Sequence, residues 1–146
     1  MRGGKVFIRN NIGYRGGIHM KQYEMEARPV LVVGGTAHSF LGEYMAGGLV
    51  LVLGIGKEKA MTDRGGIGSG IHGGEIIIRG EVDDYLLGVG AKKFKFTEED
   101  LERISPIIKS FCEQFGYDPP AEFLDTNYTR IGPASSRPFA SKYVWE

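Results

Sequence analysis

The sequence predicts an all-β fold in which short parallel strands stack in a coil, a single-stranded solenoid or β-helix, followed by a helix and an extended tail. Three observations lead to this prediction: a repeated glycine pattern, short aliphatic runs bounded by glycine, and no helical periodicity between those runs. Glycine supplies 23 of the 146 residues, about twice its average usage. Nearly all of these glycines lie before residue 91, so the coil is assigned to residues 1–91 and the helix and tail to residues 92–146.

The glycine repeat is clearest in residues 42–54 and 68–80. Each segment reads as a glycine turn, a Gly-Gly pair, a short run of β-prone residues and a closing glycine. Weaker copies begin at Gly3 and Gly16. A glycine pair turns a corner where a side chain would collide with the neighbouring coil, and glycine accepts a positive φ. The pairs are therefore interpreted as the corners of the coil.

Four short runs are predicted to be strands: residues 5–9, 29–33, 49–53 and 75–79. Each has about the length of an average strand. Residues 30–33 and 49–53 are apolar at every position, which is typical of parallel strands buried on both faces. Parallel strands usually need a crossover helix, yet nothing between these runs has a helical period. Coiling the chain so that each strand lies on the previous one removes that requirement.

A helix is predicted to begin after Thr97, which suits an N-cap, and its first turn is acidic, as the helix dipole favours. Gly116 suits the C-terminal cap. Pro106 lies inside the stretch, so a kink or two short helices are expected. Apolar residues recur at helical spacing between these ends: Leu101, Ile104, Ile108, Phe111, Cys112 and Phe115. This apolar stripe is expected to cover the open end or flank of the coil.

The segment 117–146 is rich in proline, and regular structure is not expected there apart from a turn of helix near Ala121–Leu124. The segment carries the aromatic residues Phe123, Tyr128, Phe139, Tyr143 and Trp145. Because disordered segments are usually poor in aromatic residues, the tail is expected to lie along a surface of its own chain or of a partner. Removing everything after Gly116 is expected to leave the coil folded and to weaken assembly.

The composition excludes several classes of partner. The formal net charge is zero, whereas binding to nucleic acid or to an anionic membrane surface rests on a basic excess. The single cysteine, Cys112, excludes an internal disulfide and fits a reducing compartment. No signal-peptide pattern is present, and no apolar run approaches the roughly 20 residues that span a bilayer. A cytoplasmic protein is therefore expected.

Three glycines, Gly68, Gly70 and Gly73, formally match the dinucleotide-binding fingerprint. That fingerprint needs a strand before it and a helix after it, so that the helix N-terminus faces the pyrophosphate. Here a strand is predicted directly after the glycines. They are therefore interpreted as corner residues, and no cofactor-binding residue is predicted.

The candidate metal ligands and the cysteine are isolated from one another. His19, His38 and His72 have no partner at metal-ligand spacing, so no metal site is predicted. Cys112 falls on the apolar stripe of the predicted helix, where the default role is that of a small buried hydrophobic residue.

The polar pairs do not indicate catalysis either. Asp83 and Asp84 would face opposite ways on a strand, and a solvated turn is the favoured interpretation. Ser135 and Ser136 lack the strand–turn–helix context of a nucleophile elbow. Because no nucleophile, base and oxyanion hole come together, no catalytic residue is predicted.

The repeats resemble the GXGXG family, which includes the C-terminal β-helix domain of the glutamate synthase large subunit and one of the subunits of formylmethanofuran dehydrogenase. The resemblance rests on the repeats at residues 42–54 and 70–80 and on the Gly-Gly-Thr-Ala sequence at residues 34–37, and it covers residues 3–90. The unit Gly-Glu-Tyr-Met followed by Gly-Gly is characteristic. The chain looks like a stand-alone version of the third glutamate synthase domain, shorter and with fewer coils.

The resemblance implies a right-handed parallel β-helix with a structural role. In the family, the glutaminase cysteine, the FMN site and the iron–sulfur cysteines belong to other domains, so FMN and iron–sulfur clusters are expected on partner chains. The implied function is that of a non-catalytic subunit that holds an amidotransferase and an FMN-containing synthase chain together, in a complex that converts glutamine and 2-oxoglutarate to glutamate. Two alternatives stay open: a scaffold of another redox complex such as formylmethanofuran dehydrogenase, and a self-sufficient enzyme with its site between protomers. The oligomeric state also stays open, a homo-oligomer included.

Overall fold

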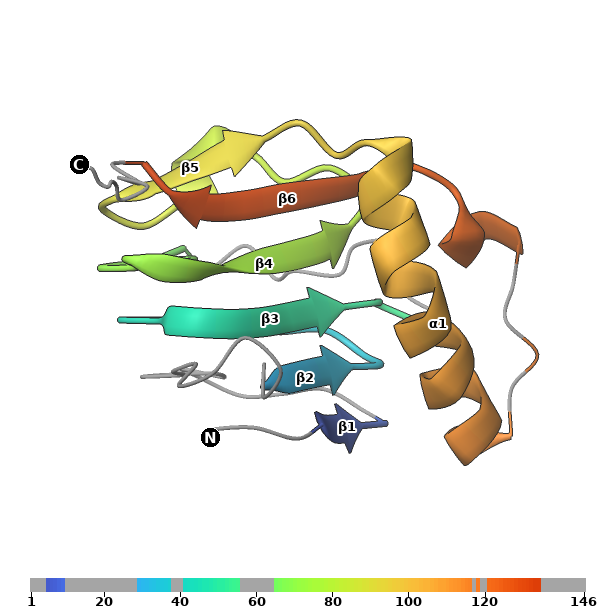
Figure 1. Cartoon of the computed structure of the whole chain (residues 1–146). Helices are drawn as coiled ribbons and strands as arrows, with labels where there is room; N and C mark the ends of the chain where they lie inside the picture. Colours follow the sequence, from blue (N-terminus) through green and yellow to red (C-terminus); the bar gives the residue numbers. More distant parts are fainter. Residues whose placement is uncertain are drawn as a thin grey trace.

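The computed structural model describes residues 5–9, 29–37, 41–55, 65–116, 118 and 121–134. Within these residues the chain forms six strands, one α-helix and two short 3-10 helices (Figure 1). In chain order they are β1 (Lys5–Ile8), β2 (Val30–Val33), β3 (Ala46–Val52), β4 (Gly73–Arg79), η2 (Asp84–Leu86), β5 (Ala91–Phe94), α1 (Glu98–Phe115), η3 (Ala121–Leu124) and β6 (Tyr128–Pro133). The four predicted strands correspond to β1–β4, and the predicted helix corresponds to α1.

All six strands belong to one mixed sheet with the order β1-β2-β3-β4-β6-β5. The first four strands are parallel and lie side by side in chain order, with Val30 opposite Leu49 and Val50 opposite Ile76. The last two strands reverse this direction. β6 pairs antiparallel with β4, and β5 pairs antiparallel with the outer side of β6.

The predicted right-handed parallel β-helix is therefore wrong, as is the all-β class. The aliphatic runs are buried and parallel as expected, but the sheet ends in two antiparallel strands and carries a long helix on one face, in an α/β-like arrangement. Burial of apolar strands on both faces needs a cover on each side. The prediction coiled the strands on one another with the helix over the open end or flank, whereas in the structure α1 covers one face of a sheet and the connecting turns cover the other.

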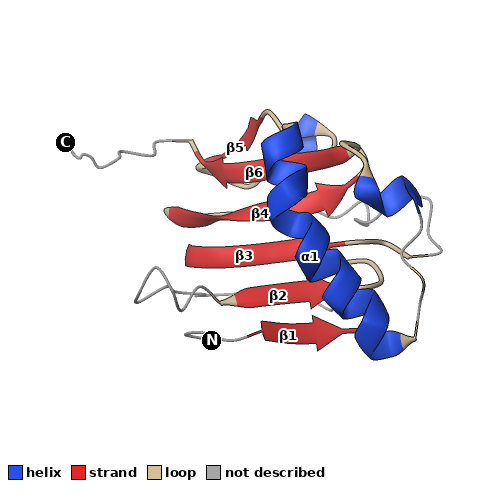
Figure 2. Ribbon diagram, turned by 45° about the vertical axis from the view of Figure 1, so that its right-hand side comes forward, coloured by secondary structure: helices blue, strands red, loops and turns tan. Residues whose placement is uncertain are grey.

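Helix α1 crosses one face of the sheet diagonally, from β5 and β6 at its N-terminal end to β1 at its C-terminal end (Figures 1 and 2). Its apolar stripe packs on the side chains that point to this face from the strands. The buried members of this layer are Val30, Val32, Leu49, Leu51, Leu53, Ile77, Ile104, Ile108, Phe111, Cys112, Phe123 and Tyr128. At the β1 end, the rings of Phe7 and Phe111 meet edge-on with centroids 5.6 Å apart.

The ends of α1 follow the predicted capping. The backbone N–H of Asp100 donates to the Thr97 hydroxyl and that of Thr97 donates to the Asp100 carboxylate, which together form a capping box. At the C-terminal end, Gly116 takes the left-handed conformation with φ 75°. Of the two outcomes expected at Pro106, a kink or two short helices, the second is wrong, because Pro106 lies inside one unbroken helix.

The opposite face of the sheet is covered by the turns that precede the strands, and these turns stack on one another. Backbone N–H groups of Tyr44 and Gly70 donate to the carbonyls of Ser69 and Val89, at 2.9 and 2.8 Å. Apolar side chains of the turns fill the space between the stack and the strands. They include Leu41, Met45, Ile67, Ile71 and Leu86, all buried.

The C-terminal segment holds the predicted turn of helix at Ala121–Leu124, but it also supplies a strand, β6, that was not predicted. Phe123 and Tyr128 are buried in the layer under α1, and the Tyr128 hydroxyl donates to the Phe123 carbonyl at 2.7 Å. The remaining tail aromatics, Phe139, Tyr143 and Trp145, lie outside the described residues. Among the helices of the described chain, none is long and apolar enough to cross a membrane.

Candidate functional site

The fingerprint glycines lie where the second full repeat turns into β4. Gly68 and Gly70 occupy the turn, with φ of 68° and 72°, and Gly73 is the first residue of β4. The segment that follows them is a strand, so the helix that the fingerprint requires directly after its glycines is not there. There is no room for a side chain at Gly73, because an added Cβ would overlap the carbonyl group of Ala46.

The two full repeats place equivalent residues in the same left-handed backbone conformation, and at one of these positions the first repeat has a residue other than glycine. Tyr44 has φ 55°, in the left-handed region, at the position that Gly70 fills in the next repeat. A left-handed bulky residue is uncommon and energetically unfavourable. The ring of Tyr44 lies over Gly70, where an added Cβ would come within 2.5 Å of the ring. The side chain is nevertheless half-exposed, at 50%.

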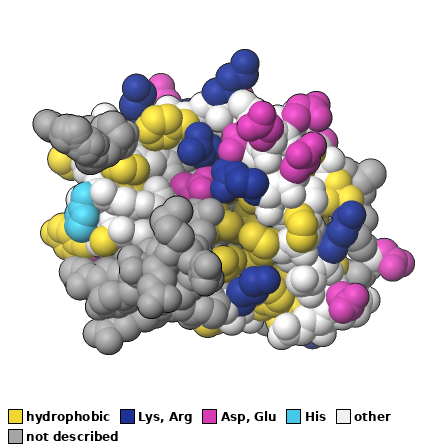
Figure 3. All heavy atoms as spheres, in the orientation of Figure 1, with side chains coloured by type: hydrophobic (Ala, Val, Ile, Leu, Met, Phe, Trp, Pro, Cys, Tyr) yellow, Lys and Arg dark blue, Asp and Glu magenta, His cyan; other side chains and the backbone are white. Residues whose placement is uncertain are grey.

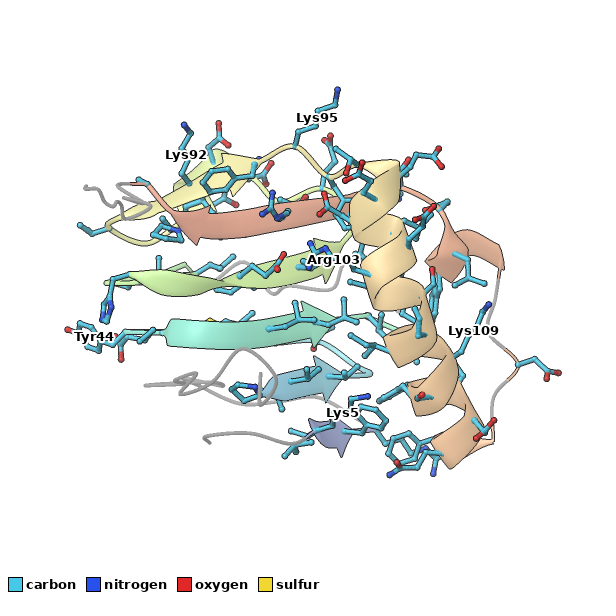
Figure 4. The ribbon with its side chains drawn as sticks, in the orientation of Figure 1. Lys5, Tyr44, Lys92, Lys95, Arg103 and Lys109 are labelled. Carbon is cyan, nitrogen blue, oxygen red and sulfur yellow. The ribbon has the colours of Figure 1, made fainter. Side chains whose placement is uncertain are left out.

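Tyr44 belongs to an exposed rim at the end of the sheet where β3 and β4 begin. We define the strand-start rim as Tyr44, His72 and Val89. The three lie on adjacent stacked turns, because the His72 N–H donates to the Met45 carbonyl at 2.9 Å and Val89 accepts from Gly70 at 2.8 Å. His72 is exposed and Val89 is 86% exposed. Figure 3 shows hydrophobic side chains and a histidine at this end, and Figure 4 places Tyr44 there.

A second group of functional interest is a charge cluster between α1 and the sheet, made of Glu75, Asp100, Arg103 and Arg130. Arg103 donates to both carboxylate oxygens of Glu75, at 2.9 and 3.1 Å, and to Asp100 at 2.6 Å. Arg130 of β6 donates to the same Glu75 carboxylate at 3.1 Å. Figure 4 shows Arg103 between the helix and the strands. Four charges that compensate one another thus join β4, β6 and α1.

Electrostatics fix the ionisation of this cluster. Burial raises the pKa of Asp100, but hydrogen bonds from Arg103 and Thr97 outweigh it, so that the pKa lies below 3.8. The hydrogen bond to Glu75 raises the pKa of Arg103 above its usual value, against the opposing effect of burial. The Arg130 guanidinium also lies over the Phe94 ring, 5.5 Å from its centroid. The Asp100 carboxylate is held charged, and both carboxylates accept hydrogen bonds from arginines, which suits positioning of elements rather than proton transfer.

The remaining candidate residues from the sequence lie outside both the strand-start rim and the charge cluster. Cys112 is buried on the side of α1 that faces the sheet, as expected for a small hydrophobic residue, and burial raises the pKa of its thiol. Asp83 precedes η2, and Asp84, whose side chain is 88% exposed, pairs with Lys93 at 2.9 Å. The solvated-turn interpretation of this acidic pair is confirmed.

Several predicted positions fall outside the described residues: Gly3, Gly16, His19, His38, Ser135 and Ser136. In the part of the chain that the structure describes, no three His, Cys, Asp or Glu side chains are grouped so as to hold a metal ion.

Comparison with known proteins shows which family the chain belongs to. Residues 1–133 match the GXGXG motif family. The chain belongs to this family. Membership suggests a domain related to glutamate synthase, and the family match extends beyond residues 3–90 to include β5, α1 and β6. An uncharacterized protein of Methanocaldococcus jannaschii is similar to the chain, with 52% identity over 139 residues. The alignment covers 92% of this chain and 53% of that protein, so the chain spans about half the length of the relative.

Sequence reasoning missed the charge cluster, although one signal was present. Glu75 and Ile77 are two residues apart on one strand, so their side chains lie on the same face. A carboxylate is therefore found on a strand face that is otherwise apolar. A charge in such a position needs a partner. The partners Arg103 and Arg130 lie 28 and 55 residues away along the chain, and no local pattern links them to Glu75.

Proposed function

We propose that the chain is a non-catalytic structural subunit of a glutamate synthase-type assembly, which converts glutamine and 2-oxoglutarate to glutamate. The match of residues 1–133 to the GXGXG motif family is the observation that carries this proposal. In the proposed assembly, the amidotransferase and the FMN-binding synthase are separate chains, and they carry the FMN and the iron–sulfur clusters. The assembly is cytoplasmic, which suits the buried free thiol of Cys112.

The geometry of the described residues supports a structural role. The core is a sheet of aliphatic strands covered on both faces, and its charge cluster locks the helix onto the strands. Such a body offers surfaces that stay fixed while partner chains carry the chemistry. The strand-start rim is the proposed contact with a catalytic chain, because it exposes an aromatic and an aliphatic side chain on stacked, hydrogen-bonded turns.

Reconstitution from purified chains tests the proposal. The tagged full chain is combined with the amidotransferase and synthase chains of the same organism, and co-elution and glutamine-dependent glutamate formation are measured. We expect a complex that contains all three chains and forms glutamate faster than the catalytic chains alone. Failure of the chain to associate with either catalytic chain would overturn the proposal.

The contribution of the rim is tested with Tyr44→Gly. Glycine adopts the left-handed conformation without strain, so this change removes the ring and keeps the turn. We expect binding to the catalytic chains to weaken on the order of tenfold, as for the loss of an aromatic anchor. Tyr85→Ala is the matched control, because Tyr85 is 70% exposed on η2, outside the rim. Equal binding by the two variants would exclude the rim as the contact.

A further inference from the structure

The two edges of the sheet are unlike each other. At one edge, β5 carries Lys92 and Lys93, charges of the kind that protect an edge strand, and Lys93 pairs with Asp84. At the other edge, β1 has β2 as its hydrogen-bonded neighbour, and no further strand adjoins it among the described residues. Val6 of β1 is 44% exposed. The edge at β1 is therefore the place where this sheet can be extended.

A single hydrogen bond shows which backbone groups of β1 face outward. The Ile8 carbonyl accepts from the Gly34 N–H at 2.7 Å, so the polar groups of Ile8 point toward β2. Peptide groups alternate along a strand, so those of Val6 also point toward β2, and those of Lys5 and Phe7 point away from it. Two N–H groups and two carbonyls thus line the outer side of β1.

A groove of about 390 Å³ runs beside this edge, between β1 and the C-terminal half of α1. From β1, Lys5 and Phe7 line it; their side chains share one face of the strand. From α1, the lining residues are Ser110, Glu113 and Gln114, whose spacing places them on one helical face. Figure 4 shows Lys5 beside this part of α1.

The groove presents opposite charges that are not paired with each other. Lys5 and Glu113 both line it, and neither forms an ion pair within the described part of the chain. A surface that carries an outward-facing strand edge, an aromatic ring and one charge of each sign is self-complementary. This is the property that an interface between two identical chains requires.

We propose that β1 pairs with β1 of a second copy of this chain, antiparallel about a two-fold axis, to give one continuous sheet across a homodimer. Strand geometry limits the register. A slip by one residue would bring opposite faces of the two strands into register and is excluded. Centring the axis on Val6 places Lys5 opposite Phe7 of the second copy and lets all four outward backbone groups form hydrogen bonds.

The same register explains the unpaired charges. Lys5 lies across from Phe7 of the second copy, and that ring lines the groove that also contains Glu113. The aliphatic stem of Lys5 covers the ring, and its ammonium group reaches Glu113 of the second copy. Because of the two-fold axis, the interface contains this Lys5–Glu113 pair twice. A lysine at an edge usually opposes strand addition, but here the opposing chain supplies its counter-charge.

Sedimentation velocity of the full chain, over a range of concentrations, tests this interface. We expect a monomer–dimer equilibrium for the wild-type chain and a monomer for Val6→Asp, because this change brings two carboxylates face to face at the axis. Val89→Asp is the matched control: it places the same charge on an exposed valine two residues before β5, the strand at the opposite edge of the sheet, and the dimer should remain. A wild-type monomer at every concentration, or a dimer that survives Val6→Asp, overturns the proposal.

Charge reversal provides a second test that does not depend on the strand itself. Lys5→Glu and Glu113→Lys each create two like-charge contacts across the axis, and each should weaken dimerisation about tenfold. The double variant K5E/E113K restores opposite charges and should restore the wild-type dissociation constant. All of these side chains are exposed, so circular dichroism should show that the fold is intact. Additive effects in the double variant would contradict the proposed pairing.

Discussion

At the scale of single residues, backbone crowding explains the glycine at position 73, where backbone freedom does not. Gly73 has no positive φ, yet a side chain there would meet the backbone of the neighbouring strand, with the Ala46 carbonyl carbon 2.8 Å from an added Cβ. Backbone cannot move aside as a flexible side chain can. Glycine at this position therefore sets how closely the start of β4 approaches β3.

This crowding predicts the effect of Gly73→Ala. Overpacking against backbone should lower the free energy of unfolding by about 1–3 kcal/mol. Gly65→Ala is the matched control, because the nearest atoms would lie 3.7 Å from its Cβ and its φ is not positive. We expect this control to change stability by less than about 1 kcal/mol. Urea denaturation of the two variants measures the difference, and equal stabilities would exclude crowding as the reason for the glycine.

The Asp100 carboxylate is a second residue whose environment predicts a measurable property. Its pKa in the folded chain lies below 3.8 because Arg103 and Thr97 donate hydrogen bonds to the ionised form, despite the opposing effect of burial. A lowered pKa contributes stability that is present above the unfolded-state pKa. That contribution is lost as the pH falls through the folded-state pKa.

Asp100→Asn should therefore cost most stability near neutral pH and progressively less below pH 3.8. The measurement is the free energy of unfolding in urea at neutral and acidic pH for the wild type and the variant. Glu99→Gln serves as the control, because Glu99 is an exposed carboxylate in the same turn of α1. A wild-type to D100N difference that stays constant with pH would contradict the assigned hydrogen bonds.

At the scale of elements, the charge cluster determines how α1 lies on the sheet. Glu75 is the shared acceptor, since it binds Arg103 of the helix and Arg130 of β6, and its side chain is only 11% exposed. The apolar stripe of α1 can slide on an aliphatic sheet, whereas bidentate ion pairs fix an angle and a distance. The cluster therefore supplies the specificity of docking, and the apolar stripe supplies most of the favourable free energy.

Glu75→Gln should lower the free energy of unfolding by about 1–3 kcal/mol, because Arg130 loses its carboxylate partner and Arg103 keeps only Asp100 in a partly buried setting. Asp84→Asn is the matched control. It breaks the Lys93–Asp84 pair, whose carboxylate is 88% exposed, and it should change stability by no more than about 0.5 kcal/mol. Thermal and urea unfolding of both variants provide the comparison. A similar small effect in both would show that the cluster contributes little.

The elements themselves were predictable where local pattern determines them. β2 and the second halves of β3 and β4 are apolar runs, and α1 has a capping residue, an apolar stripe and a terminal glycine. β6 could not be predicted in this way. It has mixed character along Tyr128–Pro133 and becomes a strand because β4 and β5 lie on either side of it. Its pairing partners are distant in the sequence, and tertiary context overrides local propensity.

At the scale of the whole molecule, the same reasoning explains why a coil was expected and a mixed sheet was found. Parallel apolar strands without crossover helices indicate stacking, and the turns that precede the strands do stack. The sequence pattern does not indicate where such stacking ends. In the structure the run of parallel strands ends at β4, where β6 pairs antiparallel and α1 returns across the sheet. That closure depends on residues after 91, whose pattern resembles no repeat.

The position of β6 reverses the expectation for truncation and yields a prediction for the whole molecule. A chain ending at Gly116 lacks β6, and with it the buried Ile131 and Tyr128 and the partner of both β4 and β5. Loss of a strand from inside a sheet exposes apolar side chains and hydrogen-bonding groups on both of its neighbours. We therefore expect this truncation to be insoluble or to lack cooperative unfolding, rather than to remain folded.

A chain ending at Ala134 retains all six strands and α1, and it is the matched comparison. It should unfold cooperatively in urea, with dispersed amide resonances in an NMR spectrum, while the shorter chain should show neither property. Binding to the catalytic chains can then be measured on the longer truncation without a folding defect, which separates the contribution of residues 135–146 to assembly from their contribution to stability. A folded chain ending at Gly116 would show that α1 and strands β1–β5 form a stable unit without β6, and that β6 adds to an already complete core.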